Sequence, residues 1–521
     1  MIDIFQYPKT VTLLLLVLQG LLRQVLTRRK RLGASLPPGP KGLPLIGNLY
    51  DMPTSTRPEL AYSELARQYG DMVYLETLGT KILVLSSLKR TTDLFERRST
   101  IYSDRHRSPM LNKEMGYEAY FSLMPYGALW RRQRKLFHEY FNPTAVKRYH
   151  SMILEERLAF VEDLLNDPKS FSQRTRSYFT RVILRSTYGI QPKGNDDPFI
   201  TQPAITVEGF NTVALTGTFM VDLIPALSYV PDSLPFTGWK KVAKFYRESS
   251  LESRISPFEY VCELHRQGVA PESAARSMIE KLPNREDPGY NEAFICAQDT
   301  TAVSYIGGSD TSLGAARSTL LLLAKNIDAQ KRAQEELDEV VGPDRLPDFN
   351  DRPRLVYVNA LIMEIMRMHQ QLPIGLPHTS TEDDIYDGYF IPKGTLVFGN
   401  SWHILHDPNV FQDPFTFNPD RFIKNGELDK HVMNPFSAAF GYGRRICPGR
   451  HISLDSLYAM VTSTLALFNI YPPKNKHGAP VPLNEDFTDG VMPALKPFDL
   501  DISPRSPQHA EFLRGLTASL V

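Results

Sequence analysis

The chain contains little cysteine. Its 521 residues include only Cys262, Cys296 and Cys447, and no two of these form a Cys-x-x-Cys pair. Three cysteines cannot make a disulfide framework, and without a Cys-x-x-Cys pair the usual zinc and thiol-redox motifs are excluded. We therefore expect a reducing, cytosol-facing environment.

The chain also lacks an excess of charge of one sign. It has 59 Lys and Arg against 58 Asp and Glu, a formal net charge of +1. Nucleic-acid binding requires a strongly basic face, so this balance argues against that class of function. Hydrophobic residues make up 42% and charged residues 22% of the chain, which is ordinary for a globular protein and excludes wholesale disorder.

No apolar run has the full length of a membrane span. The run 11–22 near the N-terminus is short for this purpose, because a span needs about 20 residues. The basic cluster 28–31 follows the run, whereas a cleaved signal peptide carries its charge before it. We predict an uncleaved membrane anchor over residues 1–27, with the basic cluster on the cytosolic side. An interfacial helix lying on the membrane is the alternative.

Proline is abundant, with 40 residues, and it gathers just after the basic cluster. Residues 36–44 read LPPGPKGLP. Because proline fixes φ and pushes the preceding residue to extended conformations, this segment is expected to be a stiff, non-helical spacer. We divide the chain into an anchor (1–27), a basic and proline-rich linker (28–56) and one large domain (57–521).

The body of the chain is mostly helical in pattern. The longest predicted helix covers about 292–325 and is apolar on most sides, which indicates burial. The segment 328–341 is amphipathic, and its Asp328 and Arg332 are spaced for an i,i+4 ion pair. The expected fold class is mostly α with small β-sheets (α+β). Strands are predicted at 72–85, with a turn at Gly79, and around 389–399.

Most of the chemical information lies in residues 440–449, FGYGRRICPG, which we call the cysteine loop. Its glycines favour a tight turn in which backbone N–H groups point at the sulfur of Cys447, and such donors stabilise a thiolate and tune a bound metal. Phe440 would shield the loop from water, and Arg445 would neutralise a ligand carboxylate by bidentate hydrogen bonding. A buried structural thiol is the alternative.

The order Phe440, Gly443, Arg445, Cys447, Gly449 resembles the haem-binding loop of the cytochrome P450 monooxygenases. The resemblance implies a P450-like fold and a haem b cofactor. It also implies that the cysteine of the loop is the axial thiolate ligand of the iron.

The middle of the long predicted helix carries the sequence GGSDT, residues 307–311. Each glycine costs about 1 kcal/mol relative to alanine in a helix interior, so the adjacent Gly307 and Gly308 need a reason. The resemblance supplies one, since it implies a groove for a diatomic ligand and an acid–alcohol pair, Asp310 and Thr311, that manages protons during O–O cleavage. Close helix packing at the glycines, with Asp310 in a buried network, is the alternative.

Further segments are similar to the family in the expected order. Glu364 and Arg367 share a helix face, and the resemblance implies that they pair with Arg421 in a buried network that supports the cysteine loop. The resemblance also implies that three residues contact the haem propionates together with the loop arginine: Trp130, Arg134 and His378.

The charged residues beside Trp130 on its predicted helix, Arg131, Arg132 and Lys135, would form part of a basic docking face for an acidic reductase. A solvated helix face is the alternative for the same residues.

The resemblance covers residues 36–505, and the segments 102–105 and 381–394 look like fungal members acting in secondary metabolism. It implies a monooxygenase anchored in the endoplasmic reticulum membrane and facing the cytosol, which receives electrons from an NADPH-cytochrome P450 reductase. A lipophilic terpenoid or polyketide is the expected substrate. The rivals are a haem-thiolate isomerase or dehydratase that needs no reductase, and a silent haem-binding protein.

By analogy with the family, several mostly apolar segments should line the substrate pocket. They are the loop 105–126, residues near 209–236, which include Phe210, Phe219 and Met220, the segments 302–307 and 372–376, and the turn near Val491.

Overall fold

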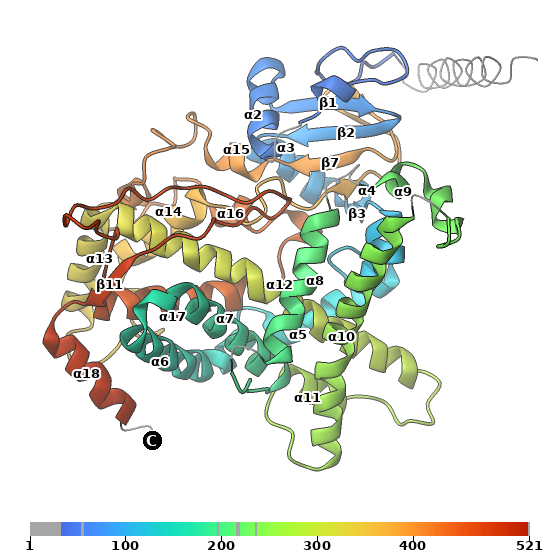
Figure 1. Cartoon of the computed structure of the whole chain (residues 1–521). Helices are drawn as coiled ribbons and strands as arrows, with labels where there is room; N and C mark the ends of the chain where they lie inside the picture. Colours follow the sequence, from blue (N-terminus) through green and yellow to red (C-terminus); the bar gives the residue numbers. More distant parts are fainter. Residues whose placement is uncertain (1–32, 54–56, 195–196, 215–218, 235–236, 519–521) are drawn as a thin grey trace, which may run out of the picture. The chain divides into compact units, whose positions relative to one another are not determined.

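The structure is a computed structural model that describes residues 33–53, 57–194, 197–214, 219–234 and 237–518 (Figure 1). The predicted membrane anchor, residues 1–27, lies outside the described residues, as does the basic cluster 28–31. In the part of the chain that the structure describes, no helix combines the length and the apolar character that a membrane crossing requires.

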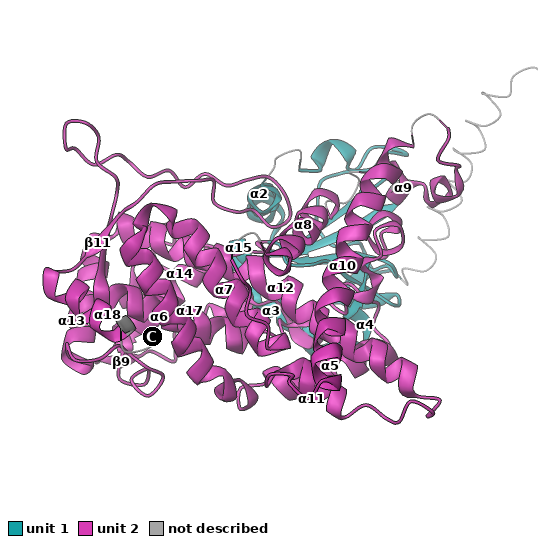
Figure 2. Ribbon diagram, turned by 60° about the horizontal axis from the view of Figure 1, so that its bottom comes forward, with its two compact units in different colours: residues 1–106, 374–404 teal, residues 107–373, 405–521 magenta. Residues whose placement is uncertain are grey.

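The described residues form two compact units, and each unit is built from two separate stretches of chain (Figure 2). Unit 1 contains the residues up to His106 together with Ile374–Ile404. Unit 2 contains Arg107–Pro373 and the residues from Leu405 onward. The predicted domain boundaries at residues 27 and 56 stay a prediction.

Unit 1 contains a five-stranded sheet with the strand order β1-β2-β7-β4-β3. Strands β1 (Met72–Thr77) and β2 (Thr80–Leu85) pair antiparallel, and positive φ angles at Leu78 and Gly79 form the tight turn between them. Such angles at both central residues are those of a primed hairpin turn, which matches the strand twist. The predicted strands around 72–85 are therefore confirmed.

The second predicted strand region, around 389–399, divides between two sheets. Strand β6 (Tyr389–Ile391) pairs with β5 (Asp384–Tyr386) in a separate hairpin, whereas β7 (Leu396–Gly399) pairs parallel with β2. A small apolar core joins the five-stranded sheet to helix α2 (Pro58–Tyr69), through Tyr62 and Phe398 among others. The other elements of unit 1 are η2 (Leu49–Asp51), α3 (Leu88–Thr91), η3 (Thr92–Arg97), α4 (Ser99–Tyr102), β3 (Asp104–Arg105), β4 (His378–Thr379) and α15 (Ser401–Leu405), which ends at the unit boundary.

Unit 2 is mainly helical and is organised around α12 (Tyr290–Lys325). This helix has buried residues over almost its whole length, as the apolar pattern predicted, because helices pack against it from several sides (Figure 1). The neighbours of α12 include α5 (Ala128–Phe141), α7 (Phe171–Tyr188), α8 (Pro198–Val213), α10 (Gly238–Arg266), α14 (Val356–Met368) and α17 (Arg450–Leu467).

The remaining elements of unit 2 are two antiparallel strand pairs and further helices, of which the three longest have 17, 14 and 12 residues. They are η4 (Pro109–Glu114), η5 (Tyr117–Ala119), η6 (Ala145–Tyr149), α6 (His150–Asn166), η7 (Pro168–Ser170), α9 (Met220–Leu223), η8 (Pro225–Tyr229), α11 (Ala274–Glu280), α13 (Ile327–Val340), η9 (Pro419–Phe422), β8 (Ile423–Lys424), β9 (Glu427–Leu428), α16 (Phe436–Ala439), η10 (Gly443–Arg445), β10 (Phe468–Tyr471), β11 (Asp501–Pro504) and α18 (Pro507–Ala518).

The amphipathic helix predicted at 328–341 is present as α13, but the ion pair predicted on it is wrong. Arg332 binds Asp420 through two hydrogen bonds, with the Nη1–Oδ2 and Nη2–Oδ1 distances 2.5 and 2.7 Å, and does not pair with Asp328. The planar guanidinium matches a carboxylate in this two-bond geometry. Asp420, which lies outside α13, is therefore the partner of Arg332 in place of Asp328, which lies one turn away on the same helix.

Candidate functional site

The cysteine loop connects α16 to α17, contains η10 and is closed by its own backbone. The Cys447 N–H donates to the Phe440 carbonyl at 2.8 Å, and the Ile446 N–H donates to the Gly443 carbonyl at 3.2 Å. Gly443 has a φ of +54°, a left-handed value that glycine adopts without a steric penalty. The glycine at this position of the predicted motif is therefore required by the turn itself.

The thiol of Cys447 lies beside the start of α17, among backbone donors and positive charges. Burial raises its pKa, while the N–H groups of Gly449 and Arg450 and the charges of Arg134 and Arg450 oppose this shift. Hydrogen bonds and positive charge favour the thiolate form of a cysteine. The loop thus places Cys447 where a bound cation would complete the stabilisation of the thiolate.

Arg134 of α5 reaches the cysteine loop from a distant part of the sequence. Its Nη2 donates to the carbonyl of Ile446 at 2.6 Å. Burial lowers the pKa of Arg134 to about 10, and the opposing negative influence comes from Cys447. Among the described residues, no ion pair joins this guanidinium to a carboxylate. A half-buried cation of this kind is suited to an anionic ligand group.

Trp130 and Arg445, both predicted to contact the cofactor, are in contact with each other. The guanidinium carbon of Arg445 lies 4.5 Å from the centre of the Trp130 ring, a cation–π distance. The same guanidinium donates to the carbonyls of Phe121 and Met124 at 3.0 and 2.8 Å. These contacts fix the arginine of the loop against the segment before α5.

Two other residues of the predicted motif have mainly structural surroundings. The Phe440 ring packs at the edge of the main apolar core of unit 2, with its centre 6.0 Å from that of Phe436. A Cβ at Gly449 would meet the Phe137 ring at 4.0 Å, an ordinary contact. The backbone N–H of Gly449 directed at the sulfur is the feature that links this glycine to the site.

These groups together form a donor set that fits a haem. Cys447 offers a single thiolate ligand, backbone N–H groups point at its sulfur, and Arg134 is a cation that could balance a carboxylate. A cysteine thiolate whose sulfur accepts hydrogen bonds from backbone N–H groups is one of the ways in which proteins hold haem iron. The fit depends on the chemistry of side chains that unit 2 brings together from α5 and the cysteine loop.

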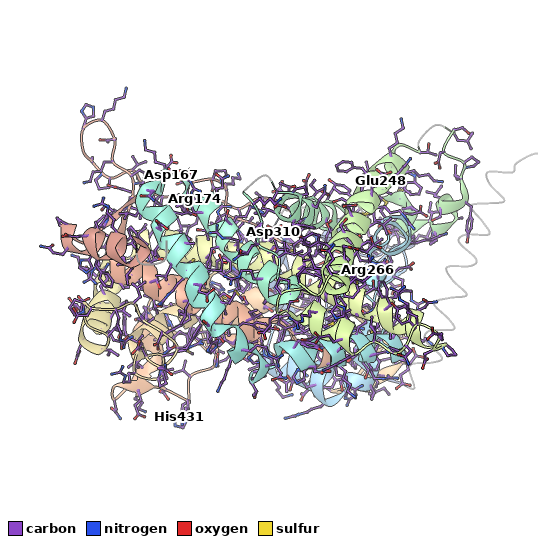
Figure 3. All side chains as sticks on the ribbon, turned by 90° about the horizontal axis from the view of Figure 1, so that it is seen from below. Asp167, Arg174, Glu248, Arg266, Asp310 and His431 are labelled. Carbon is purple, nitrogen blue, oxygen red and sulfur yellow. The ribbon has the colours of Figure 1, made fainter. Side chains whose placement is uncertain are left out.

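The predicted acid–alcohol pair lies on α12, and its two members face different partners. The Thr311 hydroxyl donates to the Gly307 carbonyl at 2.7 Å, one turn earlier in the same helix. Asp310, which is labelled in Figure 3, pairs with Arg176 of α7, with Oδ1 2.6 Å from Nη1. Arg176 was not predicted, because 134 residues separate it from Asp310 and no local pattern marks it.

The adjacent glycines of α12 have separate structural reasons. A Cβ on Gly308 would lie 2.8 and 2.9 Å from the Cδ1 and Cγ1 atoms of Ile183, so this glycine allows α7 to pack closely. A Cβ on Gly307 would meet no atom outside its local helix within 4 Å. The packing interpretation therefore holds for Gly308, whereas Gly307 has open space beside it, and the predicted groove for a diatomic ligand stays a prediction.

The predicted network around Glu364 is present and buried. Arg367 donates to both oxygens of Glu364 from Nε and Nη2, at 2.7 and 2.9 Å, and neither side chain is exposed to solvent. Arg421 contacts Oε1 of the same carboxylate at 3.2 Å. The Arg367 Nη1 also donates to the Leu405 carbonyl at 2.9 Å, so the network holds separate segments of unit 2 together.

Three of the segments predicted to line a substrate pocket meet in one apolar cluster of unit 2, which we call the pocket cluster. They come from the loop before α5, from the α8–α9 region and from α12. The predicted Val491 is buried but is not a member of this cluster, whereas Met220 is exposed. The pocket cluster contains Met110, Leu111, Met115, Tyr117, Tyr120, Val213, Val221, Ala243, Tyr246 and Ala302, with Phe210, Phe219, Val303 and Ile306 among the residues at its edge.

His378 belongs to unit 1, whereas the residues described above belong to unit 2. Its Nδ1 lies 2.6 Å from the Tyr102 carbonyl, and its ring centre lies 4.0 Å from that of Phe95. These contacts bury the imidazole between β4 and the preceding helices of unit 1. The predicted contact of His378 with a haem propionate stays a prediction.

Comparison with known proteins agrees with this chemistry. The family model described as Cytochrome P450 matches residues 37–497. The chain is 40% identical over 487 residues to the cytochrome P450 monooxygenase COX1 of Coprinopsis cinerea, covering 92% of this chain and 94% of that protein. It is 39% identical to the P450 monooxygenase eriA of Hericium erinaceus, over 92% and 91% of the two chains. It is 34% identical to tryptamine 4-monooxygenase of Psilocybe cyanescens, over 97% and 100%.

Proposed function

Since the chain belongs to the cytochrome P450 family and is a haem-dependent monooxygenase of secondary metabolism, we propose that it inserts one oxygen atom from O2 into a lipophilic terpenoid or polyketide. The observation that carries this proposal is the cysteine loop, where Cys447 lies among backbone donors and beside Arg134. The apolar pocket cluster supports a lipophilic substrate, because a pocket lined by apolar and aromatic groups selects such molecules.

The residues of the site would hold the cofactor as follows. Cys447 would bind the iron through its thiolate, and the N–H groups of Gly449 and Arg450 would moderate the electron density on its sulfur. Arg134, Trp130 and Arg445 of unit 2 would hold the propionates, and His378 of unit 1 stays a further predicted contact of the same groups. When bound, the haem supplies an iron centre that activates dioxygen.

Protons are managed by the chain's own groups on α12. Arg176 is partly exposed and holds the Asp310 carboxylate at its solvent side. With this pair open, Asp310 would relay protons between water and the interior. The Thr311 hydroxyl donates its proton to the Gly307 carbonyl, and it would have to turn away from that carbonyl to donate the proton to the reacting centre.

Electrons come from an NADPH-cytochrome P450 reductase that docks on the basic side chains of α5. Arg131 and Lys135 are exposed on this helix, while Arg132 already pairs with Glu292. An acidic partner surface would be attracted to these charges, and such attraction is weakened by salt. The anchor at residues 1–27 would hold the enzyme in the endoplasmic reticulum membrane, with the catalytic domain in the cytosol.

The proposal is tested by the optical difference spectrum of the reduced protein with carbon monoxide, recorded for the parent and for Cys447→Ala. We expect a strongly red-shifted Soret band in the parent and none in the variant, because the band depends on thiolate ligation. A folded, haem-supplied parent without this band would contradict the assignment of Cys447 and with it the monooxygenase function.

A second experiment separates the proposal from the two rivals. An isomerase or dehydratase turns over without electrons, and a silent haem protein does not turn over at all. The monooxygenase is supported if NADPH oxidation with an added reductase depends on substrate and is slower in Thr311→Ala than in the parent. Product formation that does not need the reductase would favour the isomerase or dehydratase.

A further inference from the structure

Residues 487–495 of unit 2 form a short hairpin. Phe487 and Leu495 pair across it, the Thr488 N–H donates to the Ala494 carbonyl at 2.8 Å, and the Ala494 N–H donates to the Thr488 hydroxyl oxygen at 3.0 Å. Residues 489–493, which we call the hairpin tip, form the turn. Gly490 in this turn has a φ of +122°, which favours glycine.

One side chain from a distant helix binds the hairpin tip. Asn211 of α8 accepts a hydrogen bond from the Met492 N–H at Oδ1, 2.9 Å away, and its Nδ2 donates to the Met492 carbonyl at 3.3 Å. The amide thus satisfies both backbone groups of a single residue. Such two-bond pairing fixes orientation as well as distance, since an amide offers its acceptor and donors in one plane.

Gly490 makes room for this amide. A Cβ at Gly490 would lie 2.8 Å from Cγ and 2.9 Å from Nδ2 of Asn211. The tip backbone therefore lies directly against the side chain, and a residue larger than glycine would push it away. Asn211 and Gly490 are matched in shape although they are far apart in sequence.

The residues next to these contacts belong to segments expected to line the substrate pocket. Phe210 precedes Asn211 on α8 and packs at the edge of the pocket cluster, which also includes Ile306 of α12. Val491 lies between the two tip residues that touch Asn211, and its side chain is 5% exposed. A single amide therefore connects the wall that carries Phe210 to the turn that carries Val491.

We propose that Asn211 is a positioning residue that sets substrate selectivity by holding Val491 of the hairpin tip in register with α8. This inference rests on the proposed function, because it assigns Val491 to the substrate pocket. Without the amide, the tip loses its two side-chain hydrogen bonds and Val491 is free to shift relative to Phe210. A small ligand would not sense such a shift, whereas a bulky ligand that fills the pocket would.

The test measures ligand binding in the full-length, haem-loaded protein by the Soret shift that nitrogen ligands cause. The probes are imidazole, which is small, and clotrimazole, which is bulky. For Asn211→Ala we expect the Kd for imidazole to stay within about twofold and the Kd for clotrimazole to change at least about fivefold. Thr212→Ala is the matched control, because Thr212 is exposed on α8 and its hydroxyl bonds to the Glu208 carbonyl of the same helix.

A double-mutant cycle distinguishes positioning from a general loss of stability. If Asn211 acts through Val491, the effects of Asn211→Ala and Val491→Ala on the clotrimazole-to-imidazole Kd ratio are not additive. Asn211→Asp keeps the acceptor for Met492 N–H but turns an oxygen toward the Met492 carbonyl. Asn211→Asp should therefore change the clotrimazole-to-imidazole Kd ratio in the same direction as Asn211→Ala. If Asn211→Ala does not fold, Asn211→Asp takes its place in the experiment.

Two results would overturn the inference. One is a Kd ratio in Asn211→Ala and Asn211→Asp that equals the ratio in Thr212→Ala, in proteins that keep the carbon monoxide band of the parent. The other is strict additivity in the cycle. Failure of the proposed function would look different, because the parent itself would lack the carbon monoxide band.

Discussion

Arg134 donates a hydrogen bond from Nη2 to the Ile446 carbonyl at 2.6 Å, one residue before Cys447. The helix α5 is thereby joined to the cysteine loop by a guanidinium whose pKa burial lowers to about 10. Burying a charge costs free energy, and buried cations are normally paired with an anion. We therefore expect an anion beside Arg134. A propionate of the cofactor would be that anion.

The first prediction concerns retention of the haem. Arg134→Ala should lose haem to an excess of apomyoglobin roughly tenfold faster than the parent, because a hydrogen-bonded charge pair is removed. Arg134→Lys should lie between the two, since it keeps the charge but not the fork of donors. Lys135→Ala, an exposed neighbour, is the control, and equal rates of loss in all four proteins would argue against a role for Arg134 at the haem.

The second prediction compares two arginines that bind a carboxylate through two nitrogens. Arg367 and Glu364 are fully buried, while Arg332 and Asp420 are 50% and 48% exposed. Arg367→Ala should lower the free energy of unfolding by about 3–5 kcal/mol or prevent folding, because Glu364 loses its main partner in the interior. Arg332→Ala should cost about 1 kcal/mol or less, as exposed pairs do.

Urea unfolding followed by circular dichroism measures both of these values. Each variant is compared with the parent in the haem-loaded state. Similar losses for the two arginines would show that burial does not decide their contributions to stability.

The third prediction separates the two glycines of α12. Gly308→Ala should destabilise the protein by about 1–3 kcal/mol, because the added methyl group overlaps Ile183. Gly307→Ala should keep or raise stability by up to about 1 kcal/mol, since alanine favours the helix. Unfolding curves provide the measurement, and Ile183→Ala should reduce the cost of Gly308→Ala. A larger loss of stability at Gly307 than at Gly308 would contradict this assignment.

The fourth prediction concerns Asp299, a buried carboxylate on α12. Burial raises its pKa to about 6, while Arg254 and Gln133 act in the opposite direction. Its Oδ1 lies 2.8 Å from Nε of Arg254, and its Oδ2 accepts from Gln133 at 3.3 Å. The folded state therefore binds a proton more readily than the unfolded state between about pH 4 and pH 6.

The sign of the effect follows from this raised pKa. The contribution of Asp299 to stability is present at low pH and is lost as the pH rises through about 6. The side chain that Asp299→Asn introduces does not titrate. The free energy of unfolding of this variant minus that of the parent should therefore rise by about 2 kcal/mol between pH 4.5 and pH 7.5. Taking the difference between the two pH values cancels the constant effect of leaving Arg254 unpaired. A difference that does not change with pH would contradict the prediction.

The sequence was informative where the chemistry is encoded over a few consecutive residues. The cysteine loop needs Gly443 for its turn and Cys447 for its thiol, and both are recognisable from their spacing. Glu364 and Arg367 lie one helical turn apart, so their pairing was also predictable. The long apolar stretch that became α12 and the short strands β1 and β2 were found for the same reason.

Residues that act from a distance carried no comparable signal. Arg176 binds Asp310 across two helices, and Asn211 binds a backbone 281 residues away, yet neither belongs to a motif. The ion pair predicted between Asp328 and Arg332 was wrong, because a carboxylate outside the helix offered a better geometry. The two roles of Gly307 and Gly308 also required the position of Ile183.

The sequence by itself determined the long central helix, the strands β1 and β2 and the membership of a family. It also predicted Cys447 as the thiolate ligand, and Asp310 and Thr311 as an acid–alcohol pair. Only the tertiary structure decided which partners neutralise Asp310, what fills the space beside each glycine and which side chain binds the hairpin tip. The reason is physical. Turn and helix geometry depend on neighbours along the chain, whereas the partner of a buried charge or amide is chosen by packing among segments that folding brings together.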